Sequence, residues 1–420
     1  MKKFLLVFCL LVGLIIFGIP QGFAQSYREE LERLRQRIEE LEKKVEKQEK
    51  VEVSGQAPEG ISGEVDSLKE AIGNLQFSLG ITGIVQGTIN NDDNARAVLG
   101  DGRDVFDGSY SVDLEIHAPV GENGDLWVYF EGGEGDNVTD ELGVLGGVNA
   151  DALGASVSPE ISTWGYEHSF NDDLAILTIG KLDPVAYFDT NNVANDETAD
   201  FLSDFFINNN AVEFPDYTPG VRLTLNPTEM LEINLGWLEN DADFEDLFDD
   251  SFGIVELNFK PKFLGREGNY RFYGWVNGSD HEEWDDPTAD EKGEGFGLSF
   301  DQELTDALTA FCRFGFQDED VYEAEYYWTV GAAISGCMWG REEDVLAFAF
   351  GQAILGGDYE DTLNLGGVDD GDESHFECYY SYKLNDHFTI SPMIHVVTNP
   401  GGDDDADTVV IPGFRTQMDF

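Results

Sequence analysis

Residues 408–420 read TVVIPGFRTQMDF and end the chain on an aromatic ring. Apolar or nearly apolar side chains occupy every second position of this stretch, and polar or charged side chains lie between them. The first set is Val410, Pro412, Phe414, Thr416, Met418 and Phe420, and the second is Arg415, Gln417 and Asp419. Because successive side chains of a strand point to opposite faces, the pattern predicts a strand with one apolar and one polar face. Such a strand suits a position between lipid and water.

The same alternation recurs through the chain from residue 75 onward. It predicts sixteen strands, at 75–90, 110–117, 125–133, 161–170, 174–182, 220–226, 231–238, 251–261, 269–278, 293–303, 308–317, 326–339, 345–354, 374–384, 388–397 and 408–420. The terminal strand, with its final Phe420, resembles the closing strand of bacterial outer-membrane barrels. Transmembrane barrels spread their hydrophobicity over alternating positions in this way.

The connections between the predicted strands tend to alternate in length. Short turns at 171–173, 226–230, 305–306, 340–344 and 385–387 are separated by longer, mostly acidic loops. Even-stranded barrels have short periplasmic turns, long external loops and both termini in the periplasm. The sequence therefore predicts an all-β fold, a sixteen-stranded antiparallel transmembrane β-barrel over residues 75–420. A soluble β-sandwich also has many short strands, but it does not need an apolar band on every strand.

The N-terminus has the features of an export signal. Lys2 and Lys3 precede an apolar run at 4–19, and Pro20 and the small Ala24 follow. This order predicts a signal peptide over residues 1–24 that is cleaved on export, and hence a location in the bacterial outer membrane. An uncleaved anchor is the alternative, but the run is shorter than the ~18 apolar residues that a spanning helix needs.

Residues 25–54 carry a different periodicity. Apolar side chains recur three and four residues apart at Leu31, Leu34, Ile38, Leu41 and Val45, with charges between them. This heptad pattern predicts a periplasmic α-helical coiled coil, which could also contact the cell wall, and 55–74 reads as a linker. A single amphipathic helix docked on another surface is the alternative.

The charge of the chain is extreme, with 24 basic against 84 acidic residues and a net charge of -60. Nucleic acid is excluded as a partner, because phosphate binding depends on basic patches. Acidic runs at 239–250, 280–286 and 403–407 would concentrate cations at the mouth of a channel. They could also hold Ca²⁺ or Mg²⁺ and bridge lipopolysaccharide. Because they lack a regular calcium-loop spacing, a solvated surface is favoured for each run, and the metal ligands stay unknown.

A sixteen-stranded barrel leaves an aqueous channel, so the expected function is a pore. No nucleophile-elbow or zinc-protease motif is present, and we expect neither an enzyme nor a cofactor. The longest connection, 183–220, is expected to fold inward and form a constriction from Tyr187, Phe188, Asp189, Asn191 and Asn192. A short helix is predicted from Asp196 through Phe206. The alternative is an external loop that packs on a neighbouring subunit.

Two stretches of this region carry a family resemblance. Residues 180–195 (GKLDPVAYFDTNNVAN) and 200–214 (DFLSDFFINNNAVEF) resemble carbohydrate-selective porins of the OprB type, as do 340–344, 377–380 and 390–401. The resemblance implies a homotrimeric porin for diffusion of glucose-type sugars, with membrane lipid and lipopolysaccharide around it. A cation-selective or siderophore (metal-chelate) porin, and a structural envelope tether that uses the coiled coil, are the alternatives.

Strand phase selects the residues expected to face the lumen. They are Lys181, Arg222, Arg271, Tyr273, Trp275, Arg313, Glu377 and Arg415, with Glu167 beside them. Planar hydrogen-bonding groups can replace the water around a sugar, and aromatic faces can stack on its ring. These residues are therefore predicted to line the pore and contact substrate. Their alternative role is to limit repulsion between carboxylates of the wall.

Overall fold

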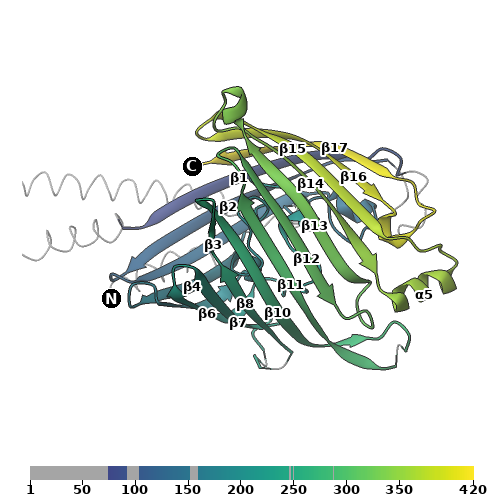
Figure 1. The fold of residues 1–420 in the computed structure, drawn as a ribbon, viewed down its shortest axis with the longest axis horizontal. Helices are drawn as coiled ribbons and strands as arrows, with labels where there is room; N and C mark the ends of the chain where they lie inside the picture. Colours follow the sequence, from purple (N-terminus) through teal and green to yellow (C-terminus); the bar gives the residue numbers. More distant parts are fainter. Residues whose placement is uncertain (1–73, 92–103, 152–158, 246, 249, 287) are drawn as a thin grey trace, which may run out of the picture. The chain divides into compact units, whose positions relative to one another are not determined.

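The computed structural model describes residues 74–420 with gaps at 92–103, 152–158, 246, 249 and 287 (Figure 1). The signal peptide, the coiled coil and all but the last residue of the linker lie outside the described residues, so these three assignments stay predictions. None of the helices in the described part of the chain is long and apolar enough to cross a membrane.

The described strands form one closed antiparallel sheet within the unit Gln76–Phe420. Closure occurs where β1(Gln76–Gly87) pairs both with β2(Phe106–Val120) and with the terminal strand β17(Val409–Asp419). Seventeen strands are present, and β9(Lys262–Phe263) is a two-residue extension paired with β10(Arg266–Glu282) outside the main sheet, which leaves sixteen in the barrel. Closure removes the exposed edges of the sheet.

The remaining strands follow in chain order, each paired with its neighbours. They are β3(Gly124–Gly135), β4(Glu160–Phe170), β5(Ala175–Leu182), β6(Thr218–Thr228), β7(Leu231–Glu239), β8(Ser251–Phe259), β11(Asp290–Glu303), β12(Leu308–Gln317), β13(Ala324–Ser335), β14(Val345–Leu355), β15(Glu373–Asn385) and β16(Phe388–Thr398). The sixteen predicted strands are confirmed, most of them to within about two residues at each end. The strand predicted at 326–339 is too long, because its last four residues form the short 3₁₀ helix η3(Gly336–Trp339).

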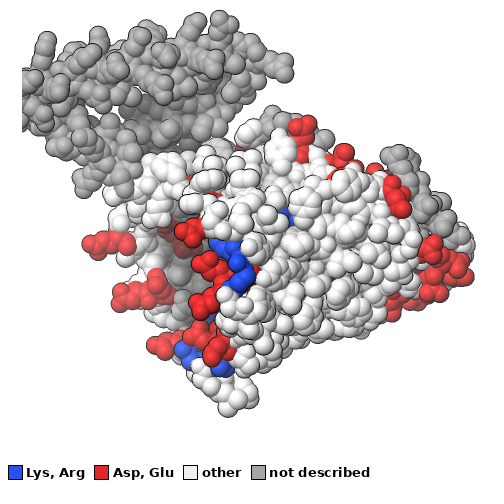
Figure 2. Space-filling model, turned by 90° about the horizontal axis from the view of Figure 1, so that it is seen from above, with Lys and Arg blue, Asp and Glu red and all other residues white. Residues whose placement is uncertain are grey.

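Exposure alternates along the strands as the sequence predicts. In β10, Phe272 and Val276 are 42% and 53% exposed, whereas Tyr273 and Trp275 between them are 4% and 3% exposed. Figure 2 shows the result as a broad uncharged wall, with Asp and Glu gathered mainly toward its two ends. An apolar outer band between charged rims matches the hydrocarbon layer of a membrane.

The predicted helix at 196–206 is wrong in extent. The described helix α4(Asp204–Ile207) has four residues, and the chain before it makes a single turn that closes with Asp200 N donating to Asp196 O at 2.7 Å. The helix cannot begin earlier because the amides of Leu202 and Ser203 bond to the Glu377 carboxylate on β15. A tertiary contact therefore replaces the local helical hydrogen bonds.

Short helices occupy several connections at the loop end of the barrel. The helix α5(Gly357–Gly366) lies between β14 and β15, and it ends at Gly367, whose φ of 78° favours glycine. Three 3₁₀ helices are η1(Val138–Glu141), η2(Pro184–Ala186) and η4(Pro400–Gly402). The predicted strands at 345–354 and 374–384 leave the α5 segment as a loop, so α5 is not predicted from the sequence.

Candidate pore-lining site

The connection between β5 and β6, residues 183–217, lies inside the barrel. Its residues bond to inward side chains of strands from widely separated parts of the wall, including Tyr273 on β10, Arg313 on β12, Glu377 on β15 and Arg415 on β17. A segment can touch all of these strands on their inner phase only from the interior. The inward fold of this connection, which we call the inserted segment, agrees with the sequence-based expectation.

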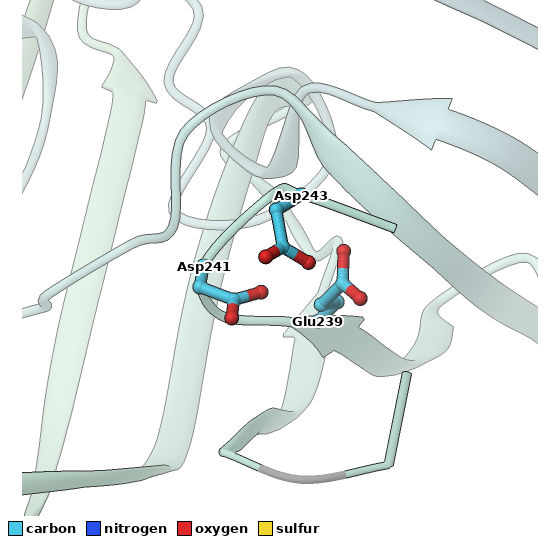
Figure 3. A group of neighbouring side chains, drawn as sticks. All are labelled: Glu239, Asp241 and Asp243. Atoms are coloured by element: carbon cyan, nitrogen blue, oxygen red, sulfur yellow. The ribbon is translucent and has the colours of Figure 1, made fainter. Parts of the chain in front are cut away.

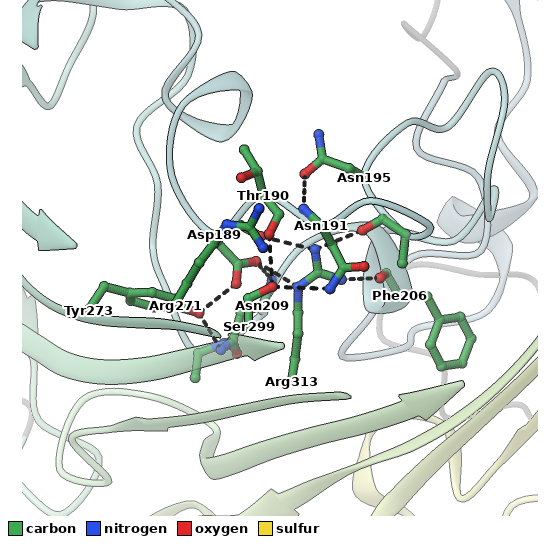
Figure 4. Close-up of polar contacts among 12 residues, drawn as sticks. Asp189, Thr190, Asn191, Asn195, Phe206, Asn209, Arg271, Tyr273, Ser299 and Arg313 are labelled. Atoms are coloured by element: carbon green, nitrogen blue, oxygen red, sulfur yellow. Dashed lines mark hydrogen bonds and ion pairs between the residues drawn. The ribbon is translucent and has the colours of Figure 1, made fainter. Parts of the chain in front are cut away.

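One anchor of the inserted segment is the pair formed by Arg313 and Asp189 (Figure 4). Arg313 Nε lies 3.0 Å from Asp189 Oδ2, and both side chains are at most 1% exposed. The Tyr273 hydroxyl donates to Asp189 Oδ1 at 2.7 Å, and the backbone N–H of Asn209 donates to Asp189 Oδ2 at 2.7 Å. A buried carboxylate needs such compensation, and here both oxygens have donors.

The rest of the Arg313 guanidinium bonds to the backbone of the inserted segment. Nη1 donates to Phe206 O at 2.5 Å, and Nη2 donates to Asp189 O at 3.0 Å and Ala194 O at 2.7 Å. These carbonyls belong to three separate parts of the segment, two bends and the helix α4. Arg313 therefore fixes its path, and little hydrogen-bonding capacity is left for a passing solute.

A second anchor lies on the other side of the inserted segment. Glu377 accepts from the amides of Leu202 at 2.9 Å and Ser203 at 3.1 Å. Arg415 donates to Asp200 O at 3.0 Å and to the carbonyl of Glu197. The predicted pore residues Glu377 and Arg415 are thus fully buried against the protein.

Two more predicted residues also have protein partners. Arg271 Nη1 lies 2.8 Å from Asp301 Oδ2, with both side chains buried. Trp275 donates its indole N–H to Ala211 O at 3.0 Å. Both point inward as predicted, and both hold the wall or the inserted segment.

Arg222 on β6 has a different environment. Its guanidinium lies 4.6 Å from the centre of the Tyr187 ring, 3.6 Å from Glu167 and 3.3 Å from Asn234 Oδ1. Its side chain is 14% exposed, against 1% for Arg313. Its Nε is buried without a hydrogen-bond partner among the described residues, as are the Nε atoms of Arg313 and Arg415, so Nε does not distinguish the three. What distinguishes Arg222 is its partial exposure beside an aromatic ring, with one hydrogen bond of its guanidinium to Asn234.

Lys181 departs from the prediction. It is in register with Trp164 and shares the strand phase of Leu177 and Ile179, which are 43%, 37% and 51% exposed. Its Nζ donates to Ile161 O at 3.2 Å near the end of β5. The inward assignment of Lys181 is wrong, because residue 181 shares the outer phase of Leu177 and Ile179, whereas the buried Thr178 has the inner phase of β5.

The predicted constriction residues separate into buried and exposed members. Phe188 is 1% exposed and packs in an apolar cluster with Phe252 and Trp275. Asn191 is buried and donates to Ser299 Oγ at 3.3 Å, whereas Asn192 is exposed. Whether these side chains define the narrowest point for a solute stays a prediction.

The site selection from sequence missed a polar cluster on β2 and β3. His117 Nδ1 lies 2.6 Å from Asp125 Oδ2, and its Nε2 lies 3.0 Å from the Tyr129 hydroxyl. All three are partly exposed, and Glu115 stands on the same phase of β2. The alternation of β2 could have revealed His117 and Glu115, because both fall on its polar face.

A closed sixteen-stranded barrel with an apolar outer band and an inward-folded loop defines an outer-membrane porin, which is a channel rather than an enzyme. The model of the "Carbohydrate-selective porin, OprB family" matches residues 103–420. The chain belongs to this family.

Individual proteins agree with this assignment. The structure is similar to the high-pH structure of Pseudomonas putida OprB at 18% identity, with a TM-score of 0.72 and coverage of 86% of this chain and 97% of that one. The low-pH structure gives a TM-score of 0.54 at 15% identity over the same shares. A mutant of Rh. blastica porin gives 0.51 at 10% identity, over 82% and 100%.

A curated relative comes from Aquifex aeolicus (strain VF5), where it is described as an uncharacterized protein. It is 26% identical over 241 residues, or 57% of this chain and 63% of the relative. The match therefore spans less than two thirds of the relative's length.

Proposed function

We propose that the barrel is a diffusion channel for small carbohydrates of the glucose type, and that Arg222 with Tyr187 forms its sugar-contact site. The observation that carries the proposal is the contrast among the inward arginines. Arg271, Arg313 and Arg415 are buried and bond to protein groups, whereas the Arg222 guanidinium is partly exposed and makes one hydrogen bond, to Asn234, within the described part of the chain. Membership in a carbohydrate-selective family supports the substrate class.

The chemistry of this pair suits a neutral sugar. A guanidinium presents several N–H donors in one plane, and sugar hydroxyls can accept them. The Tyr187 ring offers an apolar face 4.6 Å from the guanidinium carbon, and Glu167 offers an acceptor 3.6 Å from Nη1. Donor, acceptor and aromatic face converge on one part of the lumen, so a sugar can exchange part of its hydration there.

The test is block of ion current by glucose and maltose across planar bilayers that contain the refolded protein. Arg222→Ala should raise the half-blocking glucose concentration about tenfold, which corresponds to ~1.4 kcal/mol. Lys262→Ala is the matched control, since Lys262 pairs with Glu267 on the short-turn side of the barrel, away from the lumen. Equal effects of the two variants, or no block of the wild type by either sugar, would refute the proposal.

A cation-selective channel is the second candidate, and one observation favours it. Asp113, Glu115, Glu131 and Glu167 lie on the inner phase of β2, β3 and β4. A row of carboxylates attracts cations into a pore. A reversal potential in a KCl gradient near that of an ideally cation-selective channel, together with no block by sugar, would favour this candidate over the sugar channel. A metal-chelate channel belongs to the same candidate.

We further propose that three copies assemble in the outer membrane, with lipid and lipopolysaccharide against the apolar band. Family membership and exposed outer side chains such as Val255 and Val276 support this. The heptads in residues 25–54 would join the three copies or reach the cell wall. Native mass spectrometry of the full chain should give a trimer. A variant that lacks residues 25–54 tests whether the heptads are needed for it.

A further inference from the structure

Three carboxylates converge where β7 ends and the loop to β8 begins. Glu239, Asp241 and Asp243 each turn a carboxylate toward the same space (Figure 3), and one oxygen from each lies within 4.8 Å of the other two. The three residues alternate along the chain, so the loop presents every second side chain to one point. This group, which we call the β7 triad, begins three positions beyond Gly236, the residue that pairs with Arg222.

Glu239 is the unusual member of the β7 triad. The residue is 1% exposed, and its Oε2 accepts from the Phe244 amide at 3.0 Å. Its Oε1 is buried and has no hydrogen-bond partner within the described part of the chain. An unpaired buried carboxylate oxygen is costly, so the site lacks a positive partner.

No Lys or Arg ion pair within the described part of the chain supplies that partner. Among the described residues, the ion pairs of Lys and Arg involve other carboxylates and leave the β7 triad without one. Asp241 and Asp243 are exposed, and both face Glu239, although Asp243 Oδ1 also accepts from the backbone N–H of Glu245 at 2.6 Å. Three like charges at this separation repel one another unless a cation lies between them.

We propose that the β7 triad binds Ca²⁺. All three ligands are carboxylate oxygens, which favours a hard cation over zinc or copper. Calcium sits ~2.3–2.6 Å from each oxygen, so ligands up to ~5 Å apart can share one ion, whereas Mg²⁺ at ~2.0–2.1 Å requires a tighter and more regular set. The spacing of the triad matches only the first three ligand positions of known calcium loops, because Phe244 stands where such a loop has its invariant Gly. Backbone carbonyls and water would complete the coordination, and the ion would fix the loop at the channel mouth.

A second carboxylate group shows what the β7 triad adds. Glu291, Asp318 and Asp320 also bring three carboxylate oxygens within 4.8 Å, but none of these residues is fully buried. Water can solvate each of them, so no ion is required. The buried, unpaired oxygen of Glu239 is the feature that separates the two groups.

The experiment is calorimetric titration of CaCl₂ into the full chain, refolded in detergent without lipopolysaccharide and stripped with chelator. At about 0.15 M salt, we expect a saturable site with a Kd of about 10⁻⁴–10⁻³ M, the range of extracellular calcium modules. Glu239→Gln and Asp241→Asn should each raise the Kd at least about tenfold. The matched control is Glu245→Gln, which removes the same charge from the same loop outside the triad and should change the Kd less than about twofold.

Two results would overturn the proposal. One is the absence of saturable binding to the wild type up to about 10 mM Ca²⁺, tenfold above the weakest expected Kd. The other is equal weakening by Glu245→Gln and the triad variants, which would mean diffuse attraction by an acidic loop. In a parallel titration with MgCl₂, Mg²⁺ should bind with a higher Kd than Ca²⁺. A lower Kd for Mg²⁺ would contradict the choice of Ca²⁺. Asp241→Asn alters an exposed side chain, so the test stands even if Glu239→Gln fails to fold.

Discussion

Arg313 and Arg222 occupy the same strand phase of the same barrel but differ in their partners. Arg313 bonds to three carbonyls of the inserted segment and pairs with Asp189, entirely within protein. Arg222 has one hydrogen bond of 3.3 Å to Asn234, a 3.6 Å ion pair with Glu167 and a neighbouring ring. An inward arginine of a porin can therefore either hold the inserted segment in place or remain accessible to a solute. What separates the two roles is how many of its donors already have partners.

The largest expected effect is that of Arg313→Ala. It leaves Asp189 buried without its cation, and removing one partner of a buried ion pair costs about 3–5 kcal/mol. We expect a lower free energy of unfolding in urea and a larger, noisier unit conductance, because the inserted segment loses its anchor. Arg222→Ala should change the free energy of unfolding by less than about 1 kcal/mol. Similar losses of unfolding free energy in both variants would mean that Arg222 and Arg313 have the same structural role.

Glu377→Gln tests the second anchor of the inserted segment. Its carboxylate accepts from two backbone amides, and an amide side chain offers one acceptor oxygen in their place. Leaving a buried N–H unsatisfied costs about 1–3 kcal/mol. Hydrogen exchange at Leu202 and Ser203 should therefore accelerate. Glu167→Gln is the control, because Glu167 is partly exposed and pairs with Arg222 rather than with the inserted segment. It should leave exchange at these two amides unchanged.

Tyr187→Leu sharpens the assignment of the contact group. The substitution keeps an apolar side chain but removes the ring beside Arg222, and a cation–π contact at a partly exposed site contributes about 0.5–1 kcal/mol. We expect the half-blocking glucose concentration to rise about two- to fivefold. Tyr129→Phe, which keeps its ring, should have a smaller effect. The opposite order would shift the contact site toward the β2–β3 wall.

The smallest effect concerns a carboxylate that belongs to neither anchor nor contact group. In the turn before β14, a hydrogen bond from Arg341 lowers the pKa of Asp344 to about 2. Unfolded aspartate titrates near ~3.9, so this stabilisation is complete above that pH and is lost as the pH falls through about 2. The thermal midpoint should therefore drop between about pH 4 and pH 2, and Asp344→Asn should flatten that drop. An unchanged profile in the variant would contradict the assignment.

The strand pattern was predictable because it depends on one local rule, the alternation of lipid-facing and lumen-facing side chains. That rule placed Arg222, Arg271, Arg313 and Arg415 inward correctly. The inward assignment of Lys181 was wrong, because Lys181 falls on the same phase as the exposed Leu177 and Ile179. The alternation rule also could not predict the short α4, since Glu377 captures amides that a local helix would have used.

Alternation and turn length are properties of neighbouring residues, so the closed barrel, its sixteen strands and its class can be predicted from the sequence. The tertiary structure alone decided which arginine is free to meet a solute and where three acidic side chains of one loop converge. The first depends on groups far apart in the chain, such as Asp189 against Arg313 and Tyr187 against Arg222, and the second depends on the burial of Glu239 at the end of β7. Hydrogen-bond satisfaction is a property of the packed interior, so no periodicity in the sequence records it.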